Sequence, residues 1–213
     1  MSNRVNVQSP LYHADFPSLA SLGSSALPSD TLTSDRKTDG SVCLREAKLL
    51  GHLNLRGNSN NTEFKEGVEK VLGLALPLAP CTSAQNDDAT IMWLSPDEWL
   101  IIVEGGREET IEATLRKSIT GHFAVSDISG GQTILEISGP DCIKVLQKST
   151  GYDFHLKQFP VGKVIGTAFA KSSTHIRRTG EYSFQLIVRR SFADYFWLWL
   201  QQSSQEYGLR VTL

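Results

Sequence analysis

The second half of the chain repeats the pattern of the first half, and this duplication restricts the folds that the chain can adopt. Residues 53–57, LNLRG, stand before an apolar stripe at helical spacing, and residues 135–139, LEISG, stand before a second stripe. A glycine follows each stripe, at Gly73 and Gly151, and a turn proline follows each glycine. Because the register holds through both connections, we predict two copies of one supersecondary unit.

The rest of each copy also matches. Residues 91–103 are predicted to form a β-hairpin around the turn SPDE, and residues 175–188 another around TGE, because β-branched and aromatic residues flank turn formers. A helix is expected after each hairpin, the first from Arg107 and the second from an N-cap at Ser191. The remaining expected strands are residues 122–128, 164–170 and 209–213.

These elements predict an α+β fold of two β-α-β-β-α-β, ferredoxin-like units, with antiparallel-rich sheets and helices on one face. Residues 41–128 and 129–213 would be the two pseudo-repeats of a single body. Their mutual contact would form a pseudo-two-fold interface, which in many proteins is a ligand cleft.

The first 40 residues have a different composition. Ser, Pro, Asp and Thr crowd this stretch without periodicity, which predicts an extended N-terminal arm over residues 1–40. The arm still carries more apolar residues than a solvated tail usually has, so we expect the stretch from Ser9 to Leu32 to pack along another chain. These apolar residues are Leu11, Tyr12, Phe16, Leu19, Leu22 and Leu27.

Charge and cysteine content exclude several classes of protein. The net charge of −2, with mixed signs, gives no general attraction to nucleic acid or to anionic lipid. The three widely spaced cysteines argue against a disulfide framework and a zinc site, and favour a reducing compartment. The chain begins without a leader pattern and has no run of about 18 apolar residues, so we expect a cytoplasmic protein.

The familiar catalytic and cofactor motifs are missing, and the isolated candidates are weak. Neither GxGxxG nor GxxxxGK[ST] occurs, and the five histidines stand apart from one another in the sequence. Cys142 falls on an apolar stripe, which predicts a buried thiol rather than a nucleophile. Asp97 and Glu98 fit a solvent-facing turn, whereas Asp127 is the best lone carboxylate for the cleft between the units. We therefore expect no catalytic, cofactor-binding or metal-binding residue in this chain.

The stretch EYSFQLIVRRSFADYFWLWLQ, residues 181–201, instead predicts an interface. Arg189 lies on the opposite face of its strand from the apolar residues, and Arg190 precedes a helix, where a cation is unfavourable without an anionic partner. Trp197 falls outside the expected buried stripe, and Trp and Arg are enriched at interface hot spots. Arg189, Arg190 and Trp197 are therefore candidate partner contacts, although a wide core-facing stripe is the alternative. The expected stripe is Phe192, Tyr195, Phe196, Trp199 and Leu200.

Four stretches also carry a family resemblance: SPLYH, SPDEWLII, ISGPDCIKVLQKSTGYDFHLKQFPVG and FQLIVRRSFADYFWLWL. With these the chain resembles the gamma-subunit family of bacterial heterotetrameric sarcosine oxidase. The resemblance implies a fold similar to the folate-binding domain of the glycine-cleavage aminomethyltransferase. It also implies a non-catalytic structural subunit with alpha, beta and delta partners.

In that family the complex oxidatively demethylates sarcosine to glycine and produces hydrogen peroxide and 5,10-methylenetetrahydrofolate. The resemblance places FAD, FMN, NAD, tetrahydrofolate and zinc in the partner subunits and none of them in this chain. A standalone folate-binding, aminomethyltransferase-like protein is the alternative. The KGCYxGQ motif of related folate-dependent iron-sulfur assembly proteins is absent from the sequence.

Overall fold

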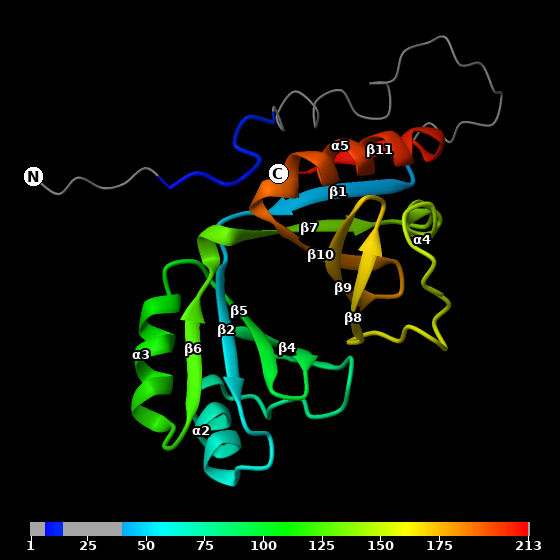
Figure 1. The fold of residues 1–213 in the computed structure, drawn as a ribbon. Helices are drawn as coiled ribbons and strands as arrows, with labels where there is room; N and C mark the ends of the chain where they lie inside the picture. Colours follow the sequence, from blue (N-terminus) through cyan, green and yellow to red (C-terminus); the bar gives the residue numbers. More distant parts are fainter. Residues whose placement is uncertain (1–6, 15–39, 213) are drawn as a thin grey trace, which may run out of the picture.

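Two β-sheets, each with helices on one side, make up the structure (Figure 1). The computed structural model describes residues 7–14 and 40–212. A five-stranded sheet has the order β3-β4-β5-β2-β6, and a six-stranded sheet has the order β11-β1-β7-β10-β9-β8. The α+β fold with antiparallel-rich sheets is thus confirmed.

The elements of the five-stranded sheet and its helices are β2 (Gly51–Gly57), α2 (Thr62–Leu72), β3 (Ser83–Gln85), β4 (Ala89–Ser95), β5 (Glu98–Val103), α3 (Glu108–Ser118) and β6 (Phe123–Asp127). Those of the six-stranded sheet are β1 (Val42–Ala47), β7 (Gln132–Ser138), α4 (Cys142–Gln147), β8 (Val164–Phe169), β9 (Ser172–Gly180), β10 (Ser183–Arg189), α5 (Ala193–Ser204) and β11 (Leu209–Val211).

The two sheets repeat one strand order. In the first, β4, β5, β2 and β6 lie side by side, and β3 is added at the edge. In the second, β9, β10, β7 and β11 follow the same order, and β8 occupies the edge that β3 occupies in the first sheet. The sequence predicted β8 but not β3.

Strand β1 breaks the symmetry between the sheets. It lies between β7 and β11, antiparallel to β7 and parallel to β11, with Val42 opposite Leu209. The sequence did not predict this strand. Although β1 precedes the first unit in the chain, it completes the sheet of the second unit.

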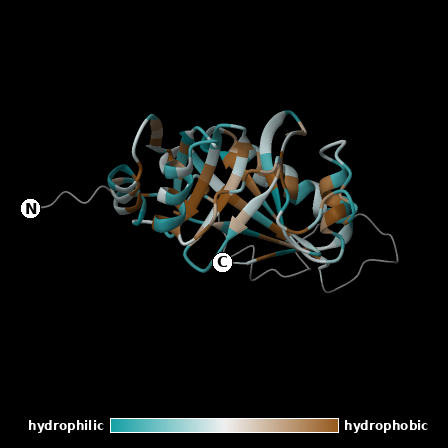
Figure 2. Ribbon diagram, turned by 90° about the horizontal axis from the view of Figure 1, so that it is seen from below, coloured by the Kyte–Doolittle hydropathy of each residue, from teal (hydrophilic) through white to brown (hydrophobic). Residues whose placement is uncertain are grey.

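Alternation along the strands gives each sheet two apolar faces. Leu53 and Leu55 of β2 point to the core under α2 and α3, while the neighbouring positions face away from it. Likewise, Leu186 and Val188 of β10 point to the core under α4 and α5, and Ile187 between them faces the other sheet. Figure 2 shows hydrophobic residues along the strands and a mixture of hydrophobic and hydrophilic residues along the helices.

The inner faces of the two sheets pack directly on each other. The buried residues of this contact are Met92, Leu100, Ile102, Ile134, Val164 and Ile187, the first three from the five-stranded sheet and the others from the six-stranded sheet. The order of layers is therefore helices, sheet, sheet, helices.

Gly57 and Gly139 occupy equivalent positions in the two units, and a side chain is excluded at each by a different neighbour. A Cβ on Gly57 would lie 2.4 Å from the Phe64 ring. Gly139 has a φ of +108°, and a Cβ there would lie 2.2 Å from the carbonyl oxygen of Ser41. Glycine is needed at both positions because a side chain would collide with the adjacent element.

The helix termini include one side-chain cap and correct one expected start. The Asn61 side chain caps α2 by accepting hydrogen bonds from the backbone N–H groups of Glu63 and Phe64. The prediction that Ser191 caps α5 is wrong: a 3₁₀ turn, Arg190–Phe192, precedes this helix, and its N-cap residue Phe192 makes no capping hydrogen bond.

The described part of the N-terminal arm belongs to the chain's own fold. Leu11 is fully buried in the core under α5, and the Ser9 hydroxyl donates to the buried Glu46 carboxylate at 2.9 Å. For Ser9 and Leu11 the expectation of packing on another chain is therefore wrong, because both side chains are buried against the chain's own core. The other expected apolar contacts of the arm, at Phe16, Leu19, Leu22 and Leu27, lie outside the described residues.

Two consecutive arginines of β9, Arg177 and Arg178, lie on opposite faces of the sheet, and each makes several hydrogen bonds to another part of the fold. Arg177, on the inner face, donates to Ser83 Oγ at 2.9 Å and to Gln85 Oε1 at 2.6 Å, both on β3 of the other sheet. Its third hydrogen bond is to Gln185 on β10. Arg177 is buried, and burial lowers the pKa of its guanidinium. The side chain therefore fastens one sheet to the other.

Arg178, on the outer face, fastens the long loop between α4 and β8. Its guanidinium donates to the carbonyl oxygens of Phe154 at 2.9 Å, Phe159 at 2.8 Å, Gly180 at 3.1 Å and Glu181. The same group lies 5.0 Å from the centre of the Phe184 ring. One buried side chain thus satisfies four backbone acceptors.

We predict that Arg178→Met lowers the free energy of unfolding by about 3 kcal/mol or more, because buried carbonyl groups lose their donors. Arg107→Met is the matched control, because Arg107 makes one exposed ion pair with Asp88 and should cost less than about 1 kcal/mol. Urea unfolding of both variants provides the measurement. Equal losses of stability in the two variants would contradict the role assigned to Arg178.

Candidate functional site: the cleft between the sheets

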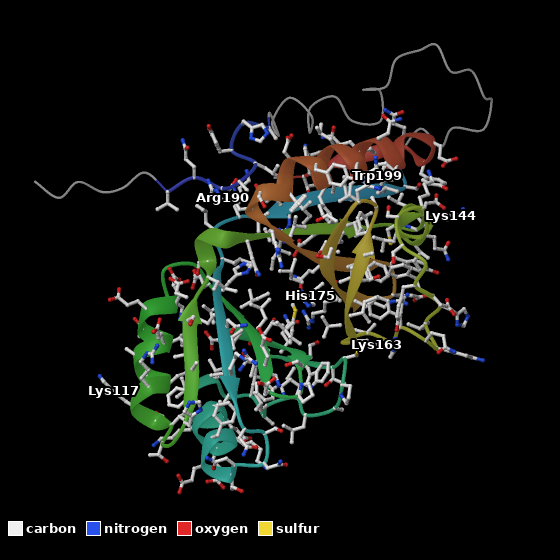
Figure 3. All side chains as sticks on the ribbon, viewed as in Figure 1. Lys117, Lys144, Lys163, His175, Arg190 and Trp199 are labelled. Carbon is white, nitrogen blue, oxygen red and sulfur yellow. The ribbon has the colours of Figure 1, made fainter. Side chains whose placement is uncertain are left out.

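A cleft of about 660 Å³ opens at one side of the contact between the sheets. Glu98 of β5 and Asn54 of β2 line it from the five-stranded sheet, and His175 of β9 and Arg189 of β10 line it from the six-stranded sheet. Figure 3 shows His175 in the region between the two halves of the molecule. The expectation that the two units enclose a cleft is therefore met.

Strand register explains why these polar side chains meet. Asn54 stands opposite Leu100 on β5, and Glu98 is two residues before Leu100, so all three share the inner face of the first sheet. His175 stands opposite Ile187, and Arg189 is two residues beyond Ile187 on the same face of β10. Each sheet thus presents an apolar residue next to a charged one.

The polar groups of the cleft are only partly satisfied within the chain. Asn54 donates to Glu98 Oε1 at 2.7 Å. Within residues 7–14 and 40–212, neither the His175 ring nor the Arg189 guanidinium makes a hydrogen bond. The cleft therefore offers a carboxylate, an imidazole and a guanidinium to a bound group.

Burial lowers the pKa of His175, and the positive charge of Arg189 lowers it further, while the Glu98 carboxylate acts in the opposite direction. The imidazole is therefore neutral at neutral pH and offers one N–H donor and one nitrogen acceptor. A neutral histidine between two opposite charges is suited to binding a polar ligand group.

The carboxylate in the cleft is not the one that the sequence favoured. Asp127 accepts a hydrogen bond from the backbone N–H of Ser129 at 2.9 Å and does not line the cleft, which is lined by its neighbours Ser126 and Ile128. Glu98, which we expected in a solvent-facing turn, points inward because it begins β5. The alternation Glu98, Leu100, Ile102 was the signal that identifies this face.

Asp97 does lie in the exposed turn, as expected. It accepts hydrogen bonds from Arg56 at 2.7 Å and from Ser95 at 2.8 Å, and these donors lower its pKa. Because its oxygens are occupied by a salt bridge and a turn, Asp97 is a structural carboxylate.

Cys142 is buried in the core under α4, as the sequence predicted. Desolvation raises the pKa of its thiol to about 12, although the positive charge of Arg178 partly opposes this. Because the thiolate is the reactive form, the native side chain is a poor nucleophile. Among the described residues, no three or more His, Cys, Asp or Glu side chains form a group that could hold a metal ion.

We predict that Cys142 stays unmodified when the native chain is treated with iodoacetamide at pH 8 and reacts once the chain is unfolded in urea. Burial and the raised pKa of its thiol both suppress the reaction. Peptide mass spectrometry gives the extent of modification, and the half-buried Cys43 and Cys81 serve as internal controls. Modification of native Cys142 as fast as either control would show that the thiol is accessible.

The three candidate interface residues lie in different environments. Arg189 lines the cleft, whereas Arg190 is exposed beside the N-terminal segment and donates a long hydrogen bond of 3.4 Å to the Gln8 carbonyl. Trp197 is only 2% exposed and packs in the core under α5. The premise that Trp197 exposes its ring is therefore wrong.

The buried stripe of α5 is shifted from the expected one. Ala193, Phe196, Trp197 and Leu200 face the core at helical spacing, whereas Leu198 is 55% exposed. Tyr195 and Trp199 are half-buried, and Phe192, in the 3₁₀ turn, is exposed. The predicted face is displaced because the small residue Ala193 is buried and the aromatic Phe192 is not.

Truncating Trp197 should therefore destabilise the free chain itself. We expect Trp197→Ala to lower the free energy of unfolding by about 3–5 kcal/mol, because it leaves a cavity in the core. Leu198→Ala, on the next residue of the same helix, should cost less than about 1 kcal/mol. Urea denaturation compares the two, and a stable Trp197→Ala chain would show that the ring does not support this core.

Comparisons with known proteins agree with the fold. A glycine-cleavage system aminomethyltransferase T from Bartonella henselae superposes with a TM-score of 0.61 at 16% identity, covering 81% of this chain and 48% of that chain. A chain of the heterotetrameric sarcosine oxidase from Corynebacterium sp. U-96, solved with pyrrole 2-carboxylate, superposes with a TM-score of 0.78 at 28% identity, covering 94% of this chain and 96% of that chain. The doubled ferredoxin-like units therefore define a protein of aminomethyltransferase-like fold.

Sequence comparison narrows this class. Residues 56–206 match the family described as "Sarcosine oxidase, gamma subunit family". The sarcosine oxidase subunit gamma of Corynebacterium sp. (strain P-1) is 33% identical over 173 residues, which are 80% of this chain and 84% of the relative. The chain belongs to the sarcosine oxidase gamma subunit family.

In the ranges that the structure describes, none of the helices combines the length and apolarity needed to span a bilayer.

Proposed function

We propose that the chain is the gamma subunit of a heterotetrameric sarcosine oxidase, assembled with alpha, beta and delta subunits in the cytoplasm. The observation that carries this proposal is the superposition on a chain of a heterotetrameric sarcosine oxidase over 94% of this chain and 96% of that chain. A match over almost the full length of both chains supports the same role in the assembly.

Within the complex the chain has a structural role. The groups that the sequence offered for chemistry are occupied in the fold: Cys142 is buried, Asp97 forms a salt bridge, and Asp127 binds a turn. The proposed complex converts sarcosine to glycine and produces hydrogen peroxide and 5,10-methylenetetrahydrofolate. Its FAD, FMN, NAD, tetrahydrofolate and zinc belong to the partner subunits in this proposal.

The surface around the start of α5 is the proposed docking surface. It comprises the exposed Tyr12, Arg190, Phe192 and Leu198. Phe192 and Leu198 expose apolar area, and Arg190 has only a long hydrogen bond to Gln8 within the described chain. Aromatic residues and arginine are enriched in interface centres, which supports contact with a partner here. Arg189 would contribute from the adjoining cleft.

We expect Arg190→Ala and Leu198→Glu each to weaken assembly with the other subunits roughly thirtyfold, because a hot-spot truncation costs about 2 kcal/mol. Arg107→Ala removes an exposed arginine from α3's N-terminus and should leave assembly unchanged. Co-expression with the other subunits and affinity capture through a tagged partner give the amount assembled, after each free variant is shown to melt like the parent.

Two outcomes of that experiment would contradict the proposal at different levels. Capture of both surface variants at the parental level would remove the docking surface but keep the subunit assignment. Failure of the unmodified chain to join the complex would overturn the assignment itself.

A further inference from the structure

We propose that the cleft between the sheets binds an extended zwitterionic molecule, whose ammonium or N–H group contacts Glu98 and whose carboxylate contacts Arg189, with an apolar spacer between them. This site adjoins the proposed docking surface, to which Arg189 would also contribute. It would make the chain a ligand-binding subunit as well as a structural one.

The charges of the cleft are the first support. Glu98 and Arg189 lie on different sheets and line the same cleft, and in the described ranges no ion pair joins them. Both act electrostatically on His175, which lies between the sheets (Figure 3). Arg56, opposite Glu98 on β2, also interacts with Glu98 electrostatically, but it forms its ion pair with Asp97. Opposite charges on the two walls of the cleft match a ligand that carries one charge of each sign.

The apolar lining between these charges is the second support. Leu100 follows Glu98 by two residues on β5, and Ile187 precedes Arg189 by two residues on β10, so each apolar residue adjoins its charge on the inner face. Leu100 and Ile187 belong to the same buried cluster between the sheets. The path from one charge to the other thus crosses apolar side chains, which favours a hydrocarbon spacer over a compact amino acid.

The polar groups beside this path are the third support. His175 has no hydrogen bond within the described ranges, and its ring packs over Gly166, where a Cβ would lie 3.3 Å from Nε2. Asn54 already orients the Glu98 carboxylate through one oxygen, which leaves the other oxygen for a ligand donor. A cleft of about 660 Å³ lies in the range of small-molecule sites.

The test uses a series of probes in which the distance between the ammonium and the carboxylate group increases. The purified full chain is titrated by calorimetry at low salt with glycine, 4-aminobutyrate and 6-aminohexanoate, and with hexanoate and hexylamine as probes of single charge. We expect one of the longer ω-amino acids to bind at least about tenfold more tightly than glycine, hexanoate or hexylamine, because only it satisfies both charges.

Glu98→Gln and Arg189→Gln should each weaken binding of that probe at least about tenfold, since each removes a charge-assisted contact. Glu98→Gln keeps an oxygen for Asn54, so the fold is preserved. The matched controls are Asp97→Asn, a carboxylate in the same turn that lines a different hollow, and Arg107→Gln, an exposed arginine of the first unit. Both should retain the parental affinity.

Three results would overturn the proposal: no binding of any ω-amino acid at tens of millimolar, equal binding by the probes of single charge, or parental affinity in either the Glu98 or the Arg189 variant. Each is independent of assembly with partner subunits. Failure here would therefore leave the proposed function intact, and failure of assembly would leave this site intact.

Discussion

The direct packing of one sheet on the other is the contact on which the rest of the structure depends. Each ferredoxin-like unit covers only one face of its sheet with helices, so the other face would be exposed if the unit stood alone. Ile134, Ile187 and their partners on β4 and β5 bury these faces together. Arg177 then fixes their relative position, because its guanidinium bonds to Ser83 and Gln85 of the opposite sheet. The cleft lies where this packing ends and polar residues replace apolar ones.

Local sequence patterns predicted most of the fold. Apolar alternation located β4, β5, β9 and β10, and the duplicated register identified the two units. The elements that were missed depend on distant partners. β3 has only three residues, and β1 pairs with residues 87 to 95 positions away on β7 and 167 positions away on β11. Neither strand therefore carries a local signal strong enough to predict its place.

The candidate site was harder to predict than the fold. The sequence predicted a cleft between the units but named Arg189 only as a partner contact. It favoured Asp127 over Glu98, and it gave no reason to choose His175, which stands apart from the other histidines. The decisive information was the register between strands, which sets the face that each side chain takes. The prediction that Trp197 is exposed was wrong for a related reason. The small residues Ala193 and Ser204 lie on the same buried face of α5, and the spacing of the aromatic residues alone does not reveal this face.

The insertion of β1 between β7 and β11 has a consequence for how the protein is made. Because Val42 pairs with Leu209, the six-stranded sheet joins residues that are 167 positions apart in the sequence. During synthesis on the ribosome, the five-stranded unit can fold while its inner apolar face is still exposed, because the second sheet has not yet formed. That second sheet cannot close until β11, Leu209–Val211, has been synthesised. Contacts of such long sequence separation slow folding, so the nascent chain carries an uncovered apolar face until β11 is available, and a chaperone that binds this face would protect the chain during that interval.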